Sequence, residues 1–222
     1  MARAALHRLR TLTRPLVPRR FHALATRAVG EVVAIGLSGT GVSCPCCRAR
    51  LRHFVEYPSL YCPRCGSYER HRLLALHLQH DPGLLSPPLR LLQVSPDRPL
   101  ERLLARAGID RVSIDLDNPN VDLLMDVHAL RFSDESFDAA LALHVVDAVA
   151  DQRRAIAEFH RVLRPGGRAI FQVPVSEQPR LLANLAAAGF DTEIVRAEDF
   201  GADAARTYAL IPEEETYVSR RL

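Results

Sequence analysis

Apolar residues change their spacing near residue 89 of this chain. From there on, short apolar runs alternate with segments whose apolar positions recur at helical spacing. Such alternation favours an α/β domain, with a mainly parallel sheet covered by helices on both faces, over residues 89–222. The predicted strands are 89–94, 112–116, 137–146, 169–175, 192–195 and 216–219, and the predicted helices are 100–107, 151–163 and 181–188.

The first 88 residues follow a different pattern. Leucines at near-helical spacing among arginines predict a basic N-terminal helical segment within residues 1–42, interrupted by two prolines. Residues 43–80 hold every cysteine and end in a predicted helix over 67–80. Two clusters of proline and glycine make residues 81–88 a linker.

Charge is distributed unevenly along the chain. Residues 1–30 carry seven arginines and no acid, whereas the remainder carries 22 arginines against 26 acids. The basic segment can be a packing helix, a contact with an acidic membrane or nucleic acid, or a targeting segment. Because the rest of the chain is mildly acidic, nucleic-acid binding is possible but not favoured.

Other compositional features exclude two classes. No apolar run approaches the roughly 18 residues of a membrane-spanning helix, so no transmembrane segment is expected. A secretory signal fits poorly, because no apolar stretch of about 7–15 residues follows the N-terminal charges. We therefore expect a cytoplasmic protein.

The cysteines are spaced as metal ligands. Cys44, Cys47, Cys62 and Cys65 form a C-x2-C-x14-C-x2-C pattern, in which each short spacer lets two thiolates reach one tetrahedral ion. We predict structural Zn²⁺, since four thiolates leave no open coordination position. Disulfides, buried free thiols and a redox pair are the alternatives, and Cys46 can replace Cys44 as a ligand.

Arginines and histidines surround this module. The arginines either offset the charge of a zinc–thiolate centre, which is favoured, or recruit a substrate through phosphate contacts. The histidines are expected to lie on the surface or pack. The residues concerned are Arg48, Arg50, Arg52, Arg64, Arg70, Arg72, His53, His71, His77 and His80.

Two stretches of the α/β half carry a family resemblance. Phe132-Ser-Asp-Glu-Ser-Phe-Asp138, followed by an apolar strand to His144 and by Phe159-His-Arg-Val-Leu-Arg-Pro-Gly-Gly167, resembles the signature of class I S-adenosylmethionine-dependent methyltransferases, type 11 group. The cysteine pairs followed by Glu69-Arg70-His71-Arg72 look like a zinc-bearing subgroup of these enzymes. The resemblance implies a Rossmann-like fold and S-adenosylmethionine as cofactor.

The resemblance also implies site residues. Ligands of open α/β sheets bind beyond the carboxyl ends of the strands. Asp115 would accept the ribose hydroxyls there, and Asp126 with Val127 would lie along the adenine. His144 would lie beside the transferred methyl group. His144 or Asp147 would take a proton from the acceptor.

The first loop departs from the family pattern. Ser95, Asp97 and Pro99 stand where three glycines are expected, and Gln93 replaces the usual acid. Glycine at such a turn permits positive φ and close approach of the backbone to the cofactor. Ser95 and Asp97 are nevertheless the predicted loop contacts, and we hypothesise that Asp97 pairs with the cofactor's ammonium group. Pro99 suits the first turn of a helix.

Three functions are consistent with these features. The first is an S-adenosylmethionine-dependent methyltransferase of unknown acceptor with a structural zinc module. The second is a non-catalytic zinc-binding interaction protein with a degenerate methyltransferase fold. The third is an RNA-modifying methyltransferase that uses the basic segment and the cysteine module.

Overall fold

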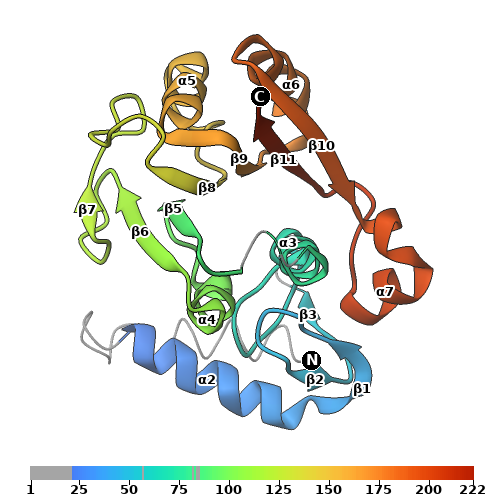
Figure 1. Ribbon diagram of the computed structural model, residues 1–222. Coiled ribbons are helices and arrows are strands. Elements are labelled where there is room, and N and C mark those ends of the chain that lie inside the picture. The colour runs from blue at the N-terminus through green and yellow to red at the C-terminus, as the bar shows by residue number, and fades with distance from the viewer. Residues whose placement is uncertain (1–21, 57, 82, 84–85) are drawn as a thin grey trace.

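The computed structural model describes residues 22–56, 58–81, 83 and 86–222, which form stacked layers (Figure 1). The described chain opens with helix α2 (His22–Gly36). Most of the predicted basic segment, residues 1–21, lies outside the described residues. Within the described range, no helix has the length and apolar character needed to cross a membrane.

A seven-stranded sheet forms the centre of the described chain. Its strands are β5 (Arg90–Val94), β6 (Asp110–Asp115), β7 (Leu123–Leu124), β8 (Phe137–Leu143), β9 (Leu163–Gln172), β10 (Phe190–Arg196) and β11 (Glu215–Arg221). They lie in the order β10-β11-β9-β8-β5-β6-β7. Only β11 runs antiparallel to its neighbours, β9 and β10. The expected mainly parallel, Rossmann-like α/β fold is confirmed.

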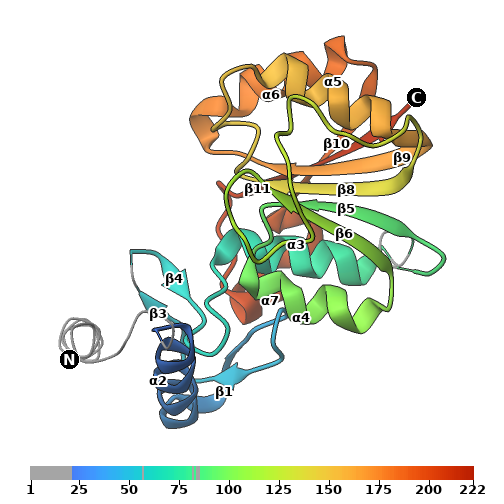
Figure 2. The ribbon, with the colours of Figure 1, turned by 90° about the vertical axis from the view of Figure 1, so that its left-hand side faces the viewer.

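Helices cover both faces of this sheet (Figure 2). One face packs against α3 (Glu69–His80) and α4 (Arg98–Ala107), and the other against α5 (Gln152–Val162) and α6 (Gln178–Ala187). Successive strand residues point to opposite faces. Leu91 and Leu141 accordingly join the core of the α3/α4 face, whereas Leu92 and Phe171 join that of the α5/α6 face.

The cysteine module lies beyond α3 and α4, next to α2 (Figure 2). It consists of two small hairpin-like sheets, β1 (Ser38–Ser43) with β2 (Arg50–Leu51) and β3 (Val55–Glu56) with β4 (Leu60–Tyr61). Its buried cysteines belong to the same apolar cluster as Leu74, Leu100 and Leu141. The module is therefore packed into one core with the sheet.

The start of β9 differs from the prediction. Pro165-Gly166-Gly167 was expected to separate a helix from a strand that begins at residue 169, but β9 already begins at Leu163. A shift in the pairing with β8, between Phe137 and Ala139, accommodates the extra residues. A side chain at Gly167 would lie 3.0 Å from the carbonyl oxygen of Asp138, so only glycine fits there.

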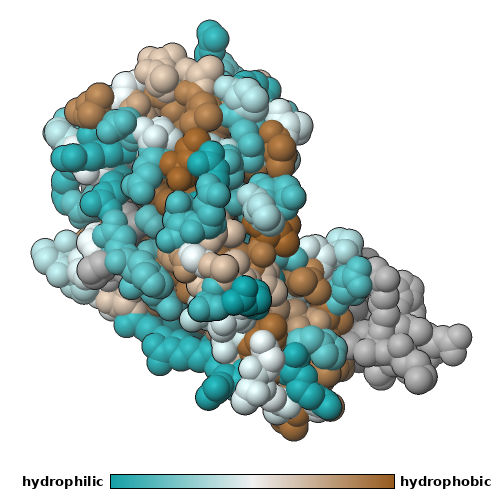
Figure 3. All heavy atoms as spheres, turned by 90° about the vertical axis from the view of Figure 1, so that its right-hand side faces the viewer, coloured by the Kyte–Doolittle hydropathy of each residue, from teal (hydrophilic) through white to brown (hydrophobic). Residues whose placement is uncertain are grey.

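The last part of the chain contains elements that were not predicted. These are the short 3₁₀ helices η3 (Val175–Glu177) and η4 (Ala197–Phe200) and the helix α7 (Gly201–Tyr208). On the face drawn in Figure 3, hydrophobic and hydrophilic side chains are interspersed. Val32 and Ile35 of α2 are among the large hydrophobic side chains that stay exposed.

Candidate cofactor and metal sites

Four thiols converge in the cysteine module. The Sγ atoms of Cys44, Cys47, Cys62 and Cys65 all lie within 4.8 Å of one another. The Cys44–Cys65 and Cys47–Cys62 separations are 3.6 and 3.7 Å. A tetrahedral zinc with bonds of about 2.3 Å requires sulfur–sulfur edges of roughly 3.8 Å. The structure therefore brings the four predicted ligands together at spacings that fit zinc.

Both cysteine pairs use the same backbone turn. The N–H of Arg48 donates to the carbonyl of Cys44 at 2.7 Å, and the N–H of Gly66 donates to that of Cys62 at 2.8 Å. Both donor residues have positive φ, 62° at Arg48 and 82° at Gly66. Glycine adopts such a backbone freely at Gly66. The equivalent strain at Arg48 was not predicted, because a bulky arginine gives no signal of a left-handed turn.

The cluster has the chemistry of a metal donor set. Hydrogen bonds with Cys44, Cys47 and Cys65, reinforced by burial, raise the pKa of the Cys62 thiol well above its ordinary value. A bound dication would reverse this effect, since a coordinating thiol is deprotonated. All five cysteines are free thiols. Cys46 is fully buried with its Sγ 3.5 Å from the carbonyl oxygen of His71, and it is not one of the four cysteines whose sulfurs converge.

The first turn of α3 connects the module to the α/β domain. Glu69 is buried and accepts hydrogen bonds from the hydroxyl of Ser59 at 2.5 Å and from a backbone N–H of β4 at 2.8 Å. Arg72 is fully buried and donates to four backbone carbonyls, two in the module and two at the end of α7. Arg72 is thus an internal brace and not a phosphate contact.

His71 links the same turn to the first loop of the sheet. Its Nδ1 accepts a hydrogen bond from the N–H of Tyr68 at 3.0 Å. The proton of the neutral ring therefore lies on Nε2, which donates to Oδ2 of Asp97 at 2.8 Å. Because His71 is only 1% exposed, this contact is fixed by packing. His71 was expected to lie on the surface or to pack. It is buried, and its hydrogen bond to Asp97 is an additional contact that the sequence did not predict.

Asp97 is the carboxylate that receives this hydrogen bond. Burial opposes its ionisation, but the hydrogen bond from His71 and the nearby Arg70 outweigh burial and lower the pKa of the carboxyl. Asp97 also precedes α4 as its N-cap residue, and Pro99 occupies the first turn as predicted. The loop is therefore held from the cysteine module on one side and from α4 on the other.

Ser95 is the first residue after β5 and has a φ of 48°. Serine thus adopts the glycine-like backbone that the family pattern requires. Asp115 ends β6 and accepts hydrogen bonds from the N–H groups of Asp117 and Asn118 at 3.1 and 3.0 Å. Burial raises the pKa of Asp115, but these bonds and one from Ser95 lower it overall. The structure brings Ser95 and Asp115 together.

His144 occupies the matching position after β8, again with positive φ, 52°. The Nε2 atom of His144, the Oδ1 atom of Asp147 and the Oε1 atom of Gln172 are buried and have no hydrogen-bond partner among the described residues. Buried polar atoms are nearly always partnered, so these three atoms at one edge of the sheet are available to a ligand or to ordered water. Burial and the nearby Arg70 lower the pKa of His144, which keeps its ring neutral.

Asp126 and Val127 follow β7. The N–H of Met125 donates to the carbonyl of Asp115 at 2.8 Å, which places this segment beside the end of β6. Asp126 is exposed and accepts a hydrogen bond from the N–H of His128 at 2.8 Å. Val127 is 6% exposed and belongs to the core of the α5/α6 face. Of this predicted pair, Asp126 is the residue whose side chain is open to a ligand.

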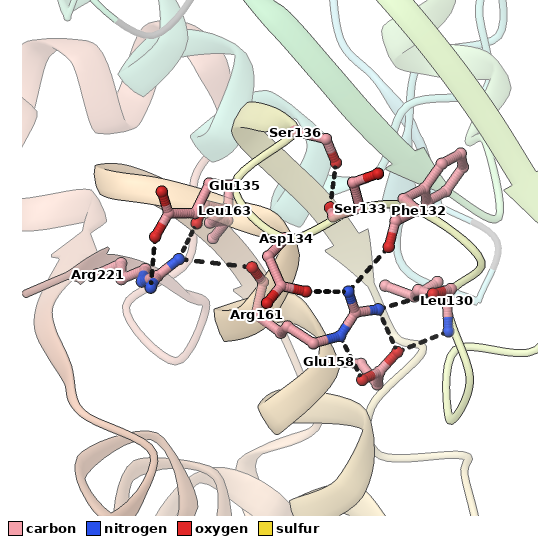
Figure 4. Close-up of polar contacts among 10 residues, drawn as sticks. All are labelled: Leu130, Phe132, Ser133, Asp134, Glu135, Ser136, Glu158, Arg161, Leu163 and Arg221. Atoms are coloured by element: carbon pink, nitrogen blue, oxygen red, sulfur yellow. Dashed lines mark hydrogen bonds and ion pairs between the residues drawn. The ribbon is translucent and has the colours of Figure 1, made fainter.

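The signature motif itself forms a structural network, shown in Figure 4. Arg161 of α5 donates to the carbonyls of Leu130 and Phe132 at 2.7 and 2.8 Å, and pairs with Asp134 at 2.7 Å. It also pairs with Glu158 at 2.8 Å. These residues precede β8 and end α5, at the amino end of the strands. The most recognisable part of the sequence therefore lies away from the predicted cofactor edge.

Comparison with known proteins supports the resemblance. Residues 100–171 match the family model described as a methyltransferase domain. An O-methyltransferase of Penicillium expansum, cnsE, is 37% identical over 78 residues, which are 33% of this chain and 28% of that protein. The chain spans less than a third of the length of the curated relatives that it matches.

Two solved structures share the fold. The [4+2]-cyclase SpnF has a TM-score of 0.52 at 18% identity, over 88% of this chain and 96% of SpnF. A didemethyltoxoflavin N1-methyltransferase of Burkholderia thailandensis, with bound S-adenosylhomocysteine, has a TM-score of 0.50 at 18% identity, over 68% and 78% of the two chains. The signature at residues 132–167 lies inside the stretch that matches the methyltransferase domain, and the α/β part of this chain shares the fold of these two structures.

Proposed function

We propose that this chain is an S-adenosylmethionine-dependent methyltransferase whose first loop is positioned by a zinc module. The observation that carries the proposal is the pair of left-handed residues, Ser95 and His144, directly after β5 and β8. These strands are neighbours at the point where the strand order reverses, which is where open α/β sheets bind ligands. Backbone strain of this kind concentrates at functional sites.

The proposed cofactor contacts follow from this geometry. Asp115, ionised and open at the end of β6, would accept the ribose hydroxyls, and Asp126 would lie beside the adenine. Asp97, oriented by His71, would face the ammonium group, with Ser95 at the turn. The bound cofactor supplies an electrophilic methyl group on a sulfonium.

Residues of the chain would supply the rest of the chemistry. Methyl transfer depends mainly on alignment, which a rigid pocket supplies. His144 keeps a neutral ring with an unpartnered Nε2, so it can accept a proton from an acceptor hydroxyl or amine. Asp147, whose Oδ1 is also buried without a partner among the described residues, would accept a proton or orient the ring.

The zinc assignment rests on the converging thiols. Cys44, Cys47, Cys62 and Cys65 would hold the ion as four thiolates, with no position left for a water or substrate. The metal would therefore stabilise the fold and not take part in the reaction. Its support for the site would pass through His71 to Asp97.

Binding of S-adenosylhomocysteine tests the proposal. Titration calorimetry should show binding to the full chain, and Asp115→Ala should weaken it about tenfold or more, because a charged hydrogen-bond acceptor is worth about 1.5–3 kcal/mol. Asp191→Ala, an exposed acid on β10 at the far edge of the sheet, is the control and should leave affinity within twofold.

Absence of heat at millimolar ligand, with folded protein confirmed, would favour the non-catalytic zinc-binding protein instead. That alternative is physically reasonable because one fold supports many functions. SpnF, a cyclase with this fold, illustrates the point.

A further inference from the structure

A cavity of about 280 Å³ lies where three parts of the described chain meet. Helix α2, the second cysteine turn and the first turns of α3 and α4 each contribute to its wall. The apolar residues of the wall include Val29, Val33, Pro63 and Pro99. The wall also contains four arginines, Arg27, Arg64, Arg70 and Arg98.

The cavity has more cations than anions. Arg64 is paired with Glu31 at 3.0 Å, and the one carboxylate of the wall, Asp97, is paired with His71. Arg27, Arg70 and Arg98 have no carboxylate within 4.0 Å in the part of the chain that the structure describes. Arg27 and Arg98 are exposed and Arg70 is half-buried, so three guanidinium groups without an ion pair among the described residues line the cavity.

Arg70 gives an independent indication of a missing partner. Its Nε atom is buried and makes no hydrogen bond within the described chain. Burying a guanidinium nitrogen without an acceptor is costly. Its charge also reaches both Asp97 and His144, whose pKa values it lowers. An oxyanion in the cavity would supply an acceptor to this guanidinium group.

The position of the cavity relates it to the proposed cofactor loop. His71 and Asp97 belong both to the cavity wall and to the contact that fixes this loop. The volume is slightly below the range of about 300–1,000 Å³ typical of small-molecule pockets, which points to a small ligand.

We propose that this cavity is the acceptor site, and that it takes small acceptors that carry a carboxylate or a phosphate. Arg27, Arg70 and Arg98 hold the oxyanion, because a guanidinium fork matches its geometry, and the apolar residues of the wall contact the rest of the molecule. This assignment rests on the proposed methyltransferase function and names its substrate class.

Calorimetry on the full chain saturated with S-adenosylhomocysteine tests the assignment, with inorganic pyrophosphate and glutarate as the two oxyanion probes. At least one probe should bind, and the double variant Arg27→Gln/Arg98→Gln should bind it at least tenfold more weakly. Arg102→Gln/Arg106→Gln removes the same charge from α4 at residues outside the cavity wall, and should change affinity less than twofold. Whichever probe binds distinguishes a phosphate site from a carboxylate site.

Several results would overturn the acceptor assignment. The first is that neither probe binds at 10 mM, and the second is that both double variants weaken probe binding equally. The third is that a single-stranded RNA oligonucleotide displaces the probe at a concentration lower than that of the probe. A loss of S-adenosylhomocysteine affinity in Arg27→Gln/Arg98→Gln would assign the cavity to the cofactor's own carboxylate. Failure of the wild-type chain to bind S-adenosylhomocysteine would instead refute the proposed function, whatever the probes do.

Discussion

Ser95 and His144 show how residues with side chains can hold a left-handed backbone, and Ser95 does so where the family pattern has a glycine. A left-handed backbone costs a residue with a side chain about 1–2 kcal/mol. Each of these residues is held by a backbone hydrogen bond of 2.8 Å to the next strand, from Ser95 to Ile114 and from His144 to Gln172. The sheet thus imposes the conformation that glycine would adopt freely.

The contact between His71 and Asp97 yields a prediction at the same scale. His71→Phe retains the buried ring but loses the hydrogen bond, so Asp97 is no longer oriented and the pKa of its carboxyl rises toward its ordinary value. S-adenosylhomocysteine affinity should fall about tenfold, as expected for loss of a charge-assisted hydrogen bond. Calorimetry measures this affinity, and elemental analysis should show unchanged zinc.

A double-mutant cycle separates this role from simple packing. If His71 acts through Asp97, Asp97→Asn should cause a similar loss, and the double variant should be no worse than the single ones. Additive losses would show that the two residues contribute separately.

Sequence spacing revealed some site residues and not others. The convergence of Cys44, Cys47, Cys62 and Cys65 was predictable because a two-residue spacer has a direct geometric meaning. The place of Asp115 at the end of a strand was predictable from the alternation of strands and helices, whereas its role in cofactor binding stays a prediction. The contact of His71 with Asp97 was not, because it joins residues 26 positions apart and depends on how α3 packs beside the first loop.

The helices and strands that could be predicted are those whose buried apolar residues recur at a regular spacing in the sequence. The central strands and α5 were found because their apolar positions repeat with the correct period. Helix α7 was missed because it has no buried residue, so it leaves no apolar stripe in the sequence. The start of β9 was missed because Pro165 and Gly166 usually end an element, whereas here they lie inside an irregular strand.

The network around Arg161 gives a prediction for the element that it anchors. Arg161→Met removes hydrogen bonds that join α5 to the loop before β8, and leaves the partly buried Glu158 without its cation. We expect the free energy of unfolding to fall by about 2 kcal/mol. Urea unfolding measures this, and Arg180→Met, in an exposed pair with Glu177, should cost less than about 1 kcal/mol.

Because the network lies away from the cofactor edge, the folded Arg161→Met variant should still bind S-adenosylhomocysteine normally. A tenfold loss of affinity without a change in stability would contradict a purely structural role for this part of the signature.

For the molecule as a whole, three histidines make stability depend on pH. Burial is the main cause that lowers the pKa of His77, His144 and His160. In the unfolded chain they titrate near 6.5. As pH falls through this value, the unfolded state binds protons before the native state does, so the free energy of unfolding decreases. Above about pH 6.5 the three histidines are neutral in both the native and the unfolded state, so their contribution to the free energy of unfolding is constant.

The urea midpoint should therefore be lower at pH 5.5 than at pH 7.5. Carboxylates with lowered pKa values, such as Asp97 and Asp115, act at more acid pH. Burial raises the pKa of Glu214, so this one carboxyl opposes the three histidines in the comparison. His160→Phe, which preserves the edge-to-face contact with Phe190, should reduce the difference between the two midpoints. A midpoint that stays constant or rises on acidification would refute the assignment.

The shared core predicts that zinc supports the whole molecule and not only its module. The cysteines pack in one cluster with Leu100 of α4 and Leu141 of β8, so loss of the metal should loosen the α3/α4 face of the sheet. Elemental analysis should give about one zinc per chain. Cys62→Ser should lose the metal, unfold at lower temperature and bind S-adenosylhomocysteine more weakly, because His71 no longer fixes Asp97.

Cys46→Ala, which spares the four ligands, should retain the metal. Unchanged thermal stability after chelation would exclude a structural metal, and unchanged cofactor affinity in Cys62→Ser would show that the module and the first loop are energetically independent.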